Sequence, residues 1–478
     1  MTVPPPARAG LGQIARSRLL ERLRNPREPA RADAPQGAVA RPGAEGSHPT
    51  AAAGGTAKAI PDAFCRFDTH PAYERLLVSQ TAARRFGIAN PFFRVHEGAA
   101  GATTRIDGRE YVNFSSYDYL ALNGHPRIAH AVQEAVARYG TSASASRLVA
   151  GERPIQRELE QALADFYRTE ACVAFVSGHA TNVSTLATLF GPKDLIVHDA
   201  LAHNSIVEGA KLSGAHRRGF AHNDWRALDA LLAEIRGSHE RVLIVIEGLY
   251  SMDGDTPDLA RFIEVKRRHK AFLMVDEAHA LGTLGATGRG IAEHCADHGT
   301  ERGTEGGTEC GTARGAPAAA DVDIWMGTLS KTLASCGGYI AGSHALVELL
   351  KYAAPGFVYS VGLPPAQAAA ALTALRILQE EPERVERLQE NGRMFLDEAR
   401  ARGIDTGLAE GHAIAAAIIG SSLQATKLSN SLFQHGINVQ PIIHPAVEEK
   451  AARLRYFLSA AHTPEQLRAA VQALARIL

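Results

Sequence analysis

The chain has 478 residues, of which 45% are hydrophobic, so it can bury a large core, and we predict a main domain with a smaller one beside it. Lysine and arginine together number 51, as do aspartate and glutamate. This balance leaves no net field to attract nucleic acid or an anionic membrane surface, so neither is an expected partner.

The cysteines and the apolar segments indicate where in the cell the protein is expected. The five cysteines are widely spaced and form no Cys-x-x-Cys pair, so we predict free thiols and no metal site. No apolar run approaches the roughly 18 residues that a membrane-spanning helix requires. We therefore expect no membrane span and a cytoplasmic location.

The first part of the chain is rich in Ala, Pro, Gly and Arg and offers one short amphipathic segment, which could not bury enough surface to fold alone. We predict a mostly disordered leader over residues 1–60, with docking to a partner as the alternative. Residues 61–120 are expected to form an N-terminal arm and the start of the smaller domain.

Short apolar segments alternate with helical patterning through residues 121–365, the predicted large domain. Strands separated by helices of about ten or more residues are typical of βαβ units, in which helices cover both faces of the sheet. The predicted strands are residues 171–176, 195–197, 242–247, 272–276, 322–326 and 339–342. The sequence therefore predicts an α/β fold with a mainly parallel sheet.

Two further segments complete the chain. Residues 296–320 carry a Gly-Thr-Glu repetition without apolar anchors, which predicts a mobile surface insert. Residues 366–478 show a long helical stretch, a strand, an amphipathic helix and two short strands. We expect a compact C-terminal α+β domain, with a ligand cleft between it and the large domain.

A lysine and an acidic motif mark the candidate active site. Lys331 lies in Thr-Leu-Ser-Lys-Thr-Leu-Ala-Ser-Cys-Gly-Gly (328–338), well after a strand that ends Val-Asp-Glu-Ala-His (275–279). Pyridoxal phosphate needs a deprotonated amine for its aldehyde, a buried carboxylate beside its pyridine nitrogen and a partner for its phenolic oxygen. Lys331, Asp276 and His279 supply these groups and predict such a site. Taken singly, Asp276 would equally suit a metal or a helix cap, and Lys331 a solvated loop.

The phosphate of this cofactor requires backbone N–H donors at the N-terminus of a helix. Ser-Gly-His-Ala-Thr-Asn (177–182) follows a predicted strand and opens a predicted helix, so we expect Gly178 and His179 to cradle the phosphate. His203 is a candidate to stack on the cofactor ring, although histidines in such positions are commonly hydrogen-bonded structural residues.

A pair of arginines is the candidate site for a substrate carboxylate. In Ala-Arg-Leu-Arg-Tyr-Phe-Leu (452–458), strand alternation places Arg453 and Arg455 on one face. One guanidinium there would bind an amino-acid carboxylate with two hydrogen bonds, and a solvated strand edge is the alternative.

From about residue 70 to its C-terminus the chain resembles the α-oxoamine synthases, a family of pyridoxal phosphate enzymes. The resemblance rests on Tyr-Val-Asn-Phe-Ser-Ser-Tyr-Asp-Tyr-Leu (111–120), Gly-Thr-Ser-Ala-Ser-Ala-Ser-Arg (140–147), Glu-Gly-Leu-Tyr-Ser-Met-Asp-Gly-Asp (247–255), Val-Asp-Glu-Ala-His (275–279) and Thr-Leu-Ser-Lys (328–331). These motifs follow one another in the order that the family shows.

The resemblance implies fold type I of the pyridoxal phosphate enzymes and a homodimer with the active site at the subunit boundary. It also implies that Lys331 carries the cofactor covalently, that Asp276 faces the pyridine nitrogen and that His203 stacks on the ring. The other implied contacts are His279 and Ser251 near the phenolic oxygen, Thr328 at the phosphate, Arg455 at the substrate carboxylate and Ser360 at the phosphate of the neighbouring subunit.

Three residues depart from the family's pattern. Tyr117, a candidate substrate-binding residue, stands where members of the biotin pathway carry Asn, whereas serine palmitoyltransferases carry Tyr. Serine and alanine therefore join glycine as candidate substrates. Val361 replaces a hydroxyl residue that many members place on the partner's phosphate, and Thr332 stands where a smaller residue is usual.

The implied reaction is a decarboxylative condensation. Lys331 removes the α-proton of the amino acid, the α-carbon attacks an acyl thioester, the thiol leaves, and loss of carbon dioxide gives an α-amino ketone. The acyl donor is acyl-CoA or an acyl carrier protein; Tyr117 and the long leader favour the carrier-bound form. An aminotransferase or amino-acid lyase of the same fold would keep Lys331 and Asp276. A non-catalytic partner subunit is the remaining alternative.

Overall fold

The computed structural model describes residues 60–85, 87–298 and 319–478. The predicted leader and most of the predicted insert lie outside the described residues, and both stay predictions, as do the predicted domain boundaries. The chain divides into two compact units, residues 1–73 and 74–478. The described end of the first unit holds the 3-10 helix η1 (Asp62–Phe64) and the start of α2 (Pro71–Arg85). The second unit contains every predicted site residue.

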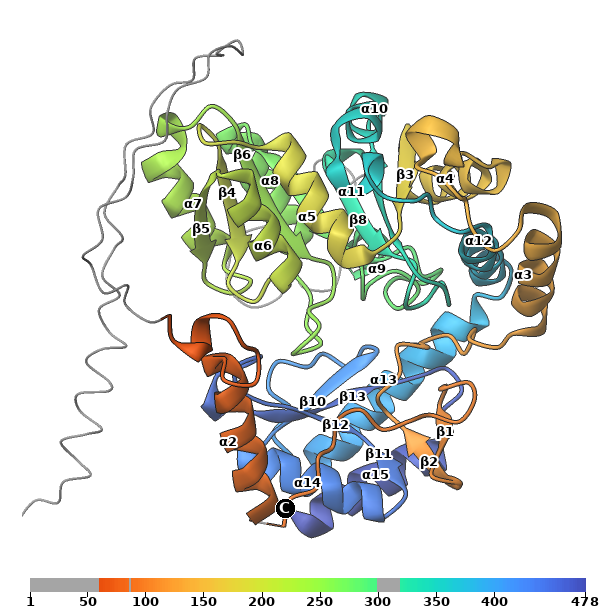
Figure 1. The fold of residues 1–478 in the computed structure, drawn as a ribbon, viewed down its shortest axis with the longest axis vertical. Helices are drawn as coiled ribbons and strands as arrows, with labels where there is room; N and C mark the ends of the chain where they lie inside the picture. The colour runs from red at the N-terminus through yellow and green to blue at the C-terminus, as the bar shows by residue number, and fades with distance from the viewer. Residues whose placement is uncertain (1–59, 86, 299–318) are drawn as a thin grey trace, which may run out of the picture. The chain divides into compact units, whose positions relative to one another are not determined.

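A seven-stranded sheet with the order β3-β9-β8-β7-β6-β4-β5 is the largest sheet of the second unit (Figure 1). Its strands are β3 (Ala171–Phe175), β4 (Leu195–Asp199), β5 (His216–Phe220), β6 (Val242–Glu247), β7 (Phe272–Asp276), β8 (Ile324–Thr328) and β9 (Gly338–Gly342). Neighbours from β8 to β5 are parallel, and β9 runs antiparallel to both β8 and β3. The predicted α/β fold with a mainly parallel sheet is confirmed.

The edge strand β5 was not predicted. Its sequence, His-Arg-Arg-Gly-Phe, leaves all but the last residue exposed, so it lacks the apolar run that marked the other strands. Charged residues on an edge strand discourage pairing with another chain, and they also hide the strand from a hydrophobicity search.

Away from the edge strand β5, the sheet is buried on both faces because its strands are mainly apolar. In β6, Val242, Ile244 and Ile246 belong to one hydrophobic core and Leu243 and Val245 to another. The first core takes side chains from α3 (Pro126–Tyr139), α4 (Pro154–Tyr167), α8 (Leu259–His269) and α12 (Pro365–Glu380), and the second from α5 (Gly178–Leu189), α6 (Asn204–Ser213) and α10 (His344–Ala353). The strand ends are thereby fixed within a rigid frame.

The C-terminal part contains two small sheets. The strands β10 (Ile414–Ile418), β13 (Arg453–Phe457) and β12 (Gln440–Ile442) form an antiparallel sheet in that order. The strands β1 (Thr103–Ile106), β2 (Arg109–Asn113) and β11 (Ile437–Asn438) form the second, in which β11 runs parallel to β2. Early and late segments of the chain therefore share one sheet. Further helices are α7 (Trp225–Ile235), α9 (Ile291–His298), α11 (Pro355–Val358), α14 (Ser422–Gln434), α15 (Pro464–Ile477), the π-helix η2 (Arg147–Gly151) and the 3-10 helices η3 (Arg236–Ser238), η4 (Ala319–Asp321) and η5 (Glu449–Ala451).

The long helical stretch predicted after residue 365 is two helices, α12 and α13 (Glu383–Ala401). Pro382 separates them, because proline has no amide N–H to donate and disfavours the helical conformation of the residue before it. None of the helices in the described part of the chain has the length and apolarity that a bilayer crossing requires.

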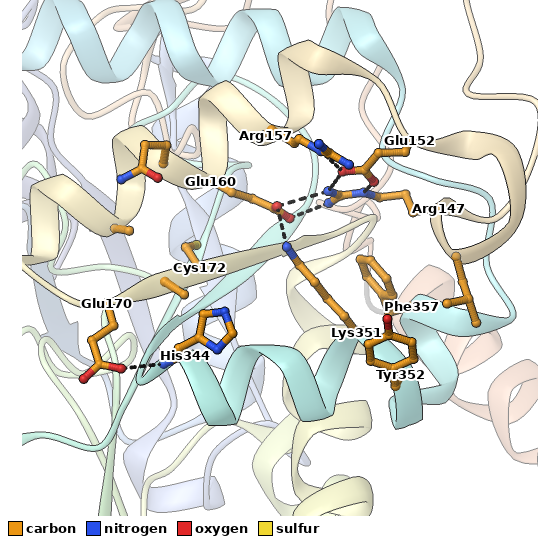
Figure 2. Close-up of a pocket in the computed structure, with 14 residues that line it drawn as sticks. Arg147, Glu152, Arg157, Glu160, Glu170, Cys172, His344, Lys351, Tyr352 and Phe357 are labelled. Atoms are coloured by element: carbon orange, nitrogen blue, oxygen red, sulfur yellow. Dashed lines mark hydrogen bonds and ion pairs between the residues drawn. The ribbon is translucent and has the colours of Figure 1, made fainter.

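A polar pocket between α4, β3 and α10 is lined by ionic side chains that pair with one another (Figure 2). The guanidinium of Arg147 binds Glu152 and Glu160, and Lys351 Nζ lies 3.0 Å from Glu160 Oε2. Glu160 Oε1 also accepts the Ala174 amide at 2.8 Å. None of the predicted site residues lines this pocket, so we assign these ion pairs to stability.

Replacing Arg147 by alanine is expected to lower the free energy of unfolding by about 3–5 kcal/mol, because Glu160 would remain buried without its main partner. The Arg147 side chain is only 2% exposed, whereas Arg157, which binds Glu152 in the same cluster, is 73% exposed. Arg157→Ala is therefore the matched control and should cost about 1 kcal/mol or less. Urea unfolding of both variants measures the difference, and equal losses would contradict it.

Candidate active site

The candidate site forms where the parallel strands end. Glu247, Asp276 and Thr328 are the last residues of β6, β7 and β8, and the carboxyl ends of neighbouring parallel strands lie at one edge of a sheet. All three side chains are buried. Two carboxylates and a hydroxyl therefore lie together at this edge of the sheet.

Asp276 is held by hydrogen bonds on both carboxylate oxygens. Oδ2 accepts from Asn182 Nδ2 at 2.9 Å, and Oδ1 accepts from the Ala278 amide at 2.9 Å. Asn182 Nδ2 also lies 2.9 Å from Ser205 Oγ, which lies 2.6 Å from His203 Nδ1. The structure thus joins two predicted residues, Asp276 and His203, through two that the sequence analysis did not single out.

A signal for Asn182 was present in the sequence. It lies one helical turn after Gly178 on α5, and residues four apart share a helix face. Ser205 follows His203 by two residues at the start of α6, where His203 itself is the N-cap and accepts the Ser205 amide. No local pattern distinguishes this serine from other helix-start residues.

His203 and Glu247 form the next contact. The His203 amide donates to Glu247 Oε1 at 2.7 Å. Burial lowers the pKa of His203, and the charge of Asp276 opposes that shift only in part. Burial raises the pKa of Glu247 well above its ordinary value, and the charge of the nearby Asp276 adds to this rise. His203 is therefore a neutral imidazole, with His179 placed edge-on to it at a ring distance of 6.4 Å.

Lys331 enters this cluster from the segment after β8. Burial lowers its pKa to about 8, although Asp276 and Glu247 act in the opposite direction. Its Nζ lies 5.5 Å from the centre of the Tyr117 ring. A lysine with this pKa is partly deprotonated near neutral pH, which a nucleophilic amine or a base requires.

His279 is enclosed by aromatic rings. Its ring is nearly parallel to that of Phe457 at 6.1 Å, with Tyr117 edge-on at 5.9 Å. Its Nδ1 lies 2.7 Å from the hydroxyl of Tyr119, a further residue that the sequence analysis missed. Burial, and then the charge of Lys331, lower the pKa of His279 well below its ordinary value. This histidine is uncharged.

The predicted phosphate cradle is closely packed. Gly178 opens α5 after the N-cap Ser177, and a Cβ at Gly178 would lie 2.9 Å from Thr328 Oγ1. Thr328 Oγ1 donates to the Gly337 carbonyl at 2.9 Å and lies 2.6 Å from Ser330 Oγ. Only glycine allows the helix N-terminus to approach these hydroxyls, and this combination of amides and hydroxyls suits a phosphate.

The two arginines of β13 differ in their partners, and the solvated-edge alternative is wrong for both. Arg453 is buried and pairs with Asp253. Arg455 Nη1 donates to the Ser251 carbonyl at 3.0 Å, and its guanidinium lies 4.5 Å from the Phe457 ring centre. Arg455 Nε is buried without a hydrogen-bond partner among the described residues. Arg455 thus keeps a donor for a ligand, and burial lowers its pKa.

The structure leaves Ser360 apart from the other predicted residues. It lies in the segment between α11 and α12, and among the described residues no hydrogen bond links its side chain to the cluster. Its neighbours Tyr359 and Val361 are exposed, Tyr359 by 87%. The remaining predicted residues are gathered around Lys331, His279, the cradle and Arg455.

Comparison with known proteins agrees with this geometry. The model of the aminotransferase class I and II family matches residues 109–474. The 8-amino-7-oxononanoate synthases of Thermoanaerobacter pseudethanolicus and Geobacter sulfurreducens are 36% and 40% identical over 80% of this chain, and over 91% and 93% of their own lengths. A serine palmitoyltransferase variant from S. paucimobilis, solved with a pyridoxal phosphate–myriocin adduct, has a TM-score of 0.77 at 27% identity and covers 85% of this chain and 97% of its own.

The chain belongs to the aminotransferase class I and II family and, within it, to the α-oxoamine synthases. It is a pyridoxal phosphate-dependent acyltransferase that condenses an amino acid with an acyl thioester and releases carbon dioxide. The resemblance drawn from the motifs is confirmed, and so are the cofactor and the reaction class. The donors at Lys331, the α5 N-terminus and Arg455 fit this cofactor and substrate.

Proposed function

We propose that the amino-acid substrate is small, namely glycine, alanine or serine, and that it binds with its carboxylate on Arg455 and its α-carbon beside Lys331. The observation that carries this proposal is the Nε of Arg455, which is buried and has no hydrogen-bond partner in the described part of the chain, in the same cluster as the buried Lys331 on which the charge of Arg455 acts. The Tyr117 ring lies 5.5 Å from Lys331 Nζ, and the ring contacts of Tyr117 with His279 and of His279 with Phe457 place an aromatic cluster on this side of the lysine, which favours a short side chain on the substrate.

Each residue has a defined role in the proposal. Pyridoxal phosphate, when bound, supplies an electron sink for the α-carbon. Lys331 Nζ would hold the cofactor and serve as the base for the α-proton, because its lowered pKa leaves part of the amine unprotonated near neutral pH. Asp276, oriented by Asn182, would favour a protonated pyridine nitrogen. Gly178, His179 and Thr328 would hold the phosphate, and His203 would lie beside the cofactor ring.

His279 and Ser251 lie at the phenolic oxygen in this assignment. The Tyr119 hydroxyl keeps its proton, since burial raises its pKa well above the ordinary value. We assign it as the donor to His279 Nδ1, so that Nε2 carries the imidazole proton and donates.

We also propose a cytoplasmic homodimer in which Ser360 reaches the phosphate of the neighbouring subunit. Exposed apolar side chains support a second copy of the chain as the partner: Val149 in η2, Tyr352 in α10 and Tyr359 before Ser360. The acyl donor is acyl-CoA or an acyl carrier protein, which present the same reactive carbonyl.

The proposed substrates are tested with purified enzyme loaded with pyridoxal phosphate. Glycine, alanine and serine are each supplied with an acyl-CoA and with an acyl carrier protein thioester. One of the three amino acids should release carbon dioxide and free thiol in equal amounts. Transfer of the amino group to a keto acid, without release of thiol, would contradict the proposal.

Replacing Arg455 by lysine should weaken amino-acid binding by about 10- to 100-fold, because an ammonium does not reproduce the planar set of donors that a carboxylate binds. The dissociation constant is read from the cofactor's absorbance as the amino acid is added without thioester. Arg468→Lys, at a side chain that is 46% exposed on α15, is the matched control. Unchanged affinity in the Arg455 variant would refute its role.

A further inference from the structure

A buried ionic triad lies beside the candidate site. His222 Nδ1 lies 2.8 Å from Asp199 Oδ1, and its Nε2 lies 2.8 Å from Asp255 Oδ2. The two carboxylates are almost fully buried, and His222 is 14% exposed. One imidazole therefore bridges two carboxylates that would otherwise repel each other in a medium of low polarity.

Each carboxylate of the triad also anchors backbone or amide groups. Asp199 ends β4, and its oxygens accept the amides of Leu201 and Asn223, both at 2.8 Å. Asp255 Oδ2 accepts the Asn223 side-chain amide at 2.8 Å in addition to His222. The Asp199 contacts fix the turn that leads from β4 to His203, and the Asp255 contacts fix the segment that follows β6.

That segment, residues 250–255, is a closed loop, called loop 250–255 below. The Tyr250 amide donates to the Asp255 carbonyl at 3.0 Å, and the Gly254 amide donates to the Tyr250 carbonyl at 2.9 Å. Between these bonds lies the Ser251 carbonyl, which accepts Arg455 Nη1 at 3.0 Å. His222 thus holds one end of the loop, and Arg455 binds its middle.

Arg453, the other arginine of β13, also binds loop 250–255. Arg453 Nη1 donates to the Met252 carbonyl at 3.0 Å and binds the Asp253 carboxylate. Loop 250–255 is therefore held between an imidazole on the side of the large sheet and two guanidiniums on β13. A shift of Asp255 would therefore move Ser251. It would also move the Arg455 guanidinium, which the Ser251 carbonyl orients.

The charges around His222 favour its protonated form. Burial alone would lower its pKa, but the hydrogen bonds and charges of Asp199 and Asp255 outweigh burial and raise it to about 10. The Tyr250 ring stands perpendicular to the imidazole at 4.5 Å. Hydrogen bonding to His222 lowers the pKa of Asp199 despite burial, whereas burial raises that of Asp255.

We propose that His222 is a positioning residue for the condensation: through Asp255 it fixes loop 250–255 and so sets the orientation of Arg455 toward the amino-acid carboxylate. The inference depends on the proposed function, in which Arg455 binds that carboxylate. His222 itself touches neither substrate nor cofactor in this assignment.

The test compares amino-acid affinity in matched histidine variants. His222→Gln should weaken amino-acid binding by roughly tenfold while kcat changes less, because the reacting groups around Lys331 stay in place. His269→Gln is the control: His269 on α8 pairs through Nε2 with the carboxylate of Asp229 on α7 at 2.7 Å, and among the described residues no hydrogen bond or ion pair joins this pair to loop 250–255. Asp255→Asn keeps the side chain's shape and removes its charge, so it tests the same contact if the His222 variant is unstable.

A double variant separates positioning from general destabilisation. In an Arg455→Lys background, His222→Gln should have no further effect on amino-acid affinity, because the group that it orients is already changed. Additive losses would overturn the proposal. Wild-type enzyme that binds no amino acid would instead contradict the proposed function.

A measurement without turnover completes the test. In the cofactor-free protein, the imidazole of His222 should titrate near pH 10 by NMR, identified by its loss in His222→Gln, and Asp255→Asn should move the midpoint toward neutral pH. A midpoint close to the ordinary histidine value in the unsubstituted protein would refute the ionic bridge.

Discussion

Replacing Lys331 by alanine is expected to lower kcat by about 10³-fold and to remove the visible absorbance of the covalently bound cofactor. The substitution deletes both the amine that attaches pyridoxal phosphate and the base that moves the α-proton, and general base catalysis alone contributes about 10²- to 10⁴-fold. Lys211→Ala is the control, since Lys211 lies exposed on α6 and pairs with Glu208 at 2.8 Å. Retained absorbance in the Lys331 variant would show that another amine carries the cofactor.

The same lysine predicts a pH dependence. Because its pKa is lowered to about 8, the fraction of free amine rises about tenfold per pH unit below that value and levels off above it. Covalent capture of pyridoxal phosphate by the cofactor-free protein, followed by absorbance, should show this profile. A profile that keeps rising to the ordinary lysine pKa would contradict the burial argument.

Replacing Asp276 by asparagine is expected to lower kcat/KM by about 10²- to 10³-fold with little change in the fold. The amide has the same shape, but it cannot stabilise a protonated pyridine nitrogen, and losing one partner of a buried ionic contact costs about 3–5 kcal/mol. Steady-state kinetics and the dissociation constant of the cofactor from the variant measure the effect. The Asp229→Asn variant, at the surface partner of His269, should behave as the wild type.

Asn182 provides an internal comparison for this prediction. It donates one hydrogen bond to Asp276 Oδ2, so Asn182→Ala should lower kcat/KM by about 3- to 10-fold. This loss is much smaller than the one expected when the carboxylate charge is removed. If the two variants were equally impaired, the role of Asp276 would be to hold Asn182 and not the cofactor.

The strands that carry the site could be predicted because each is a short apolar run that ends at a polar residue. The segment 242–247 was predicted with the bounds of β6, and 272–276 with those of β7. The edge strand β5 was missed because its exposed positions carry His and Arg in place of apolar residues. Strand prediction here succeeded where both faces are buried and failed where one edge is open.

The contacts between the site residues could not be predicted in the same way. Asn182 and Asp276 are 94 residues apart in sequence, and Arg455 and Ser251 are 204 apart. Their proximity follows from the order of the strands and from the packing of β13 on loop 250–255, neither of which leaves a local pattern. His222 illustrates the same limit, because one of its aspartates, Asp199, ends strand β4 and the other, Asp255, lies in the loop after β6.

The sequence by itself predicted the family and the cofactor, which the comparisons confirm, and it proposed Lys331, Asp276 and His279 as the reacting groups, since each lies in a short motif of its own. Only the tertiary structure decided which arginine keeps a free donor: Arg453 is paired with Asp253, whereas Arg455 Nε has no hydrogen-bond partner among the residues that the structure describes. Alternation along a strand places both on one face, but burial and the position of a carboxylate in a distant loop make them different.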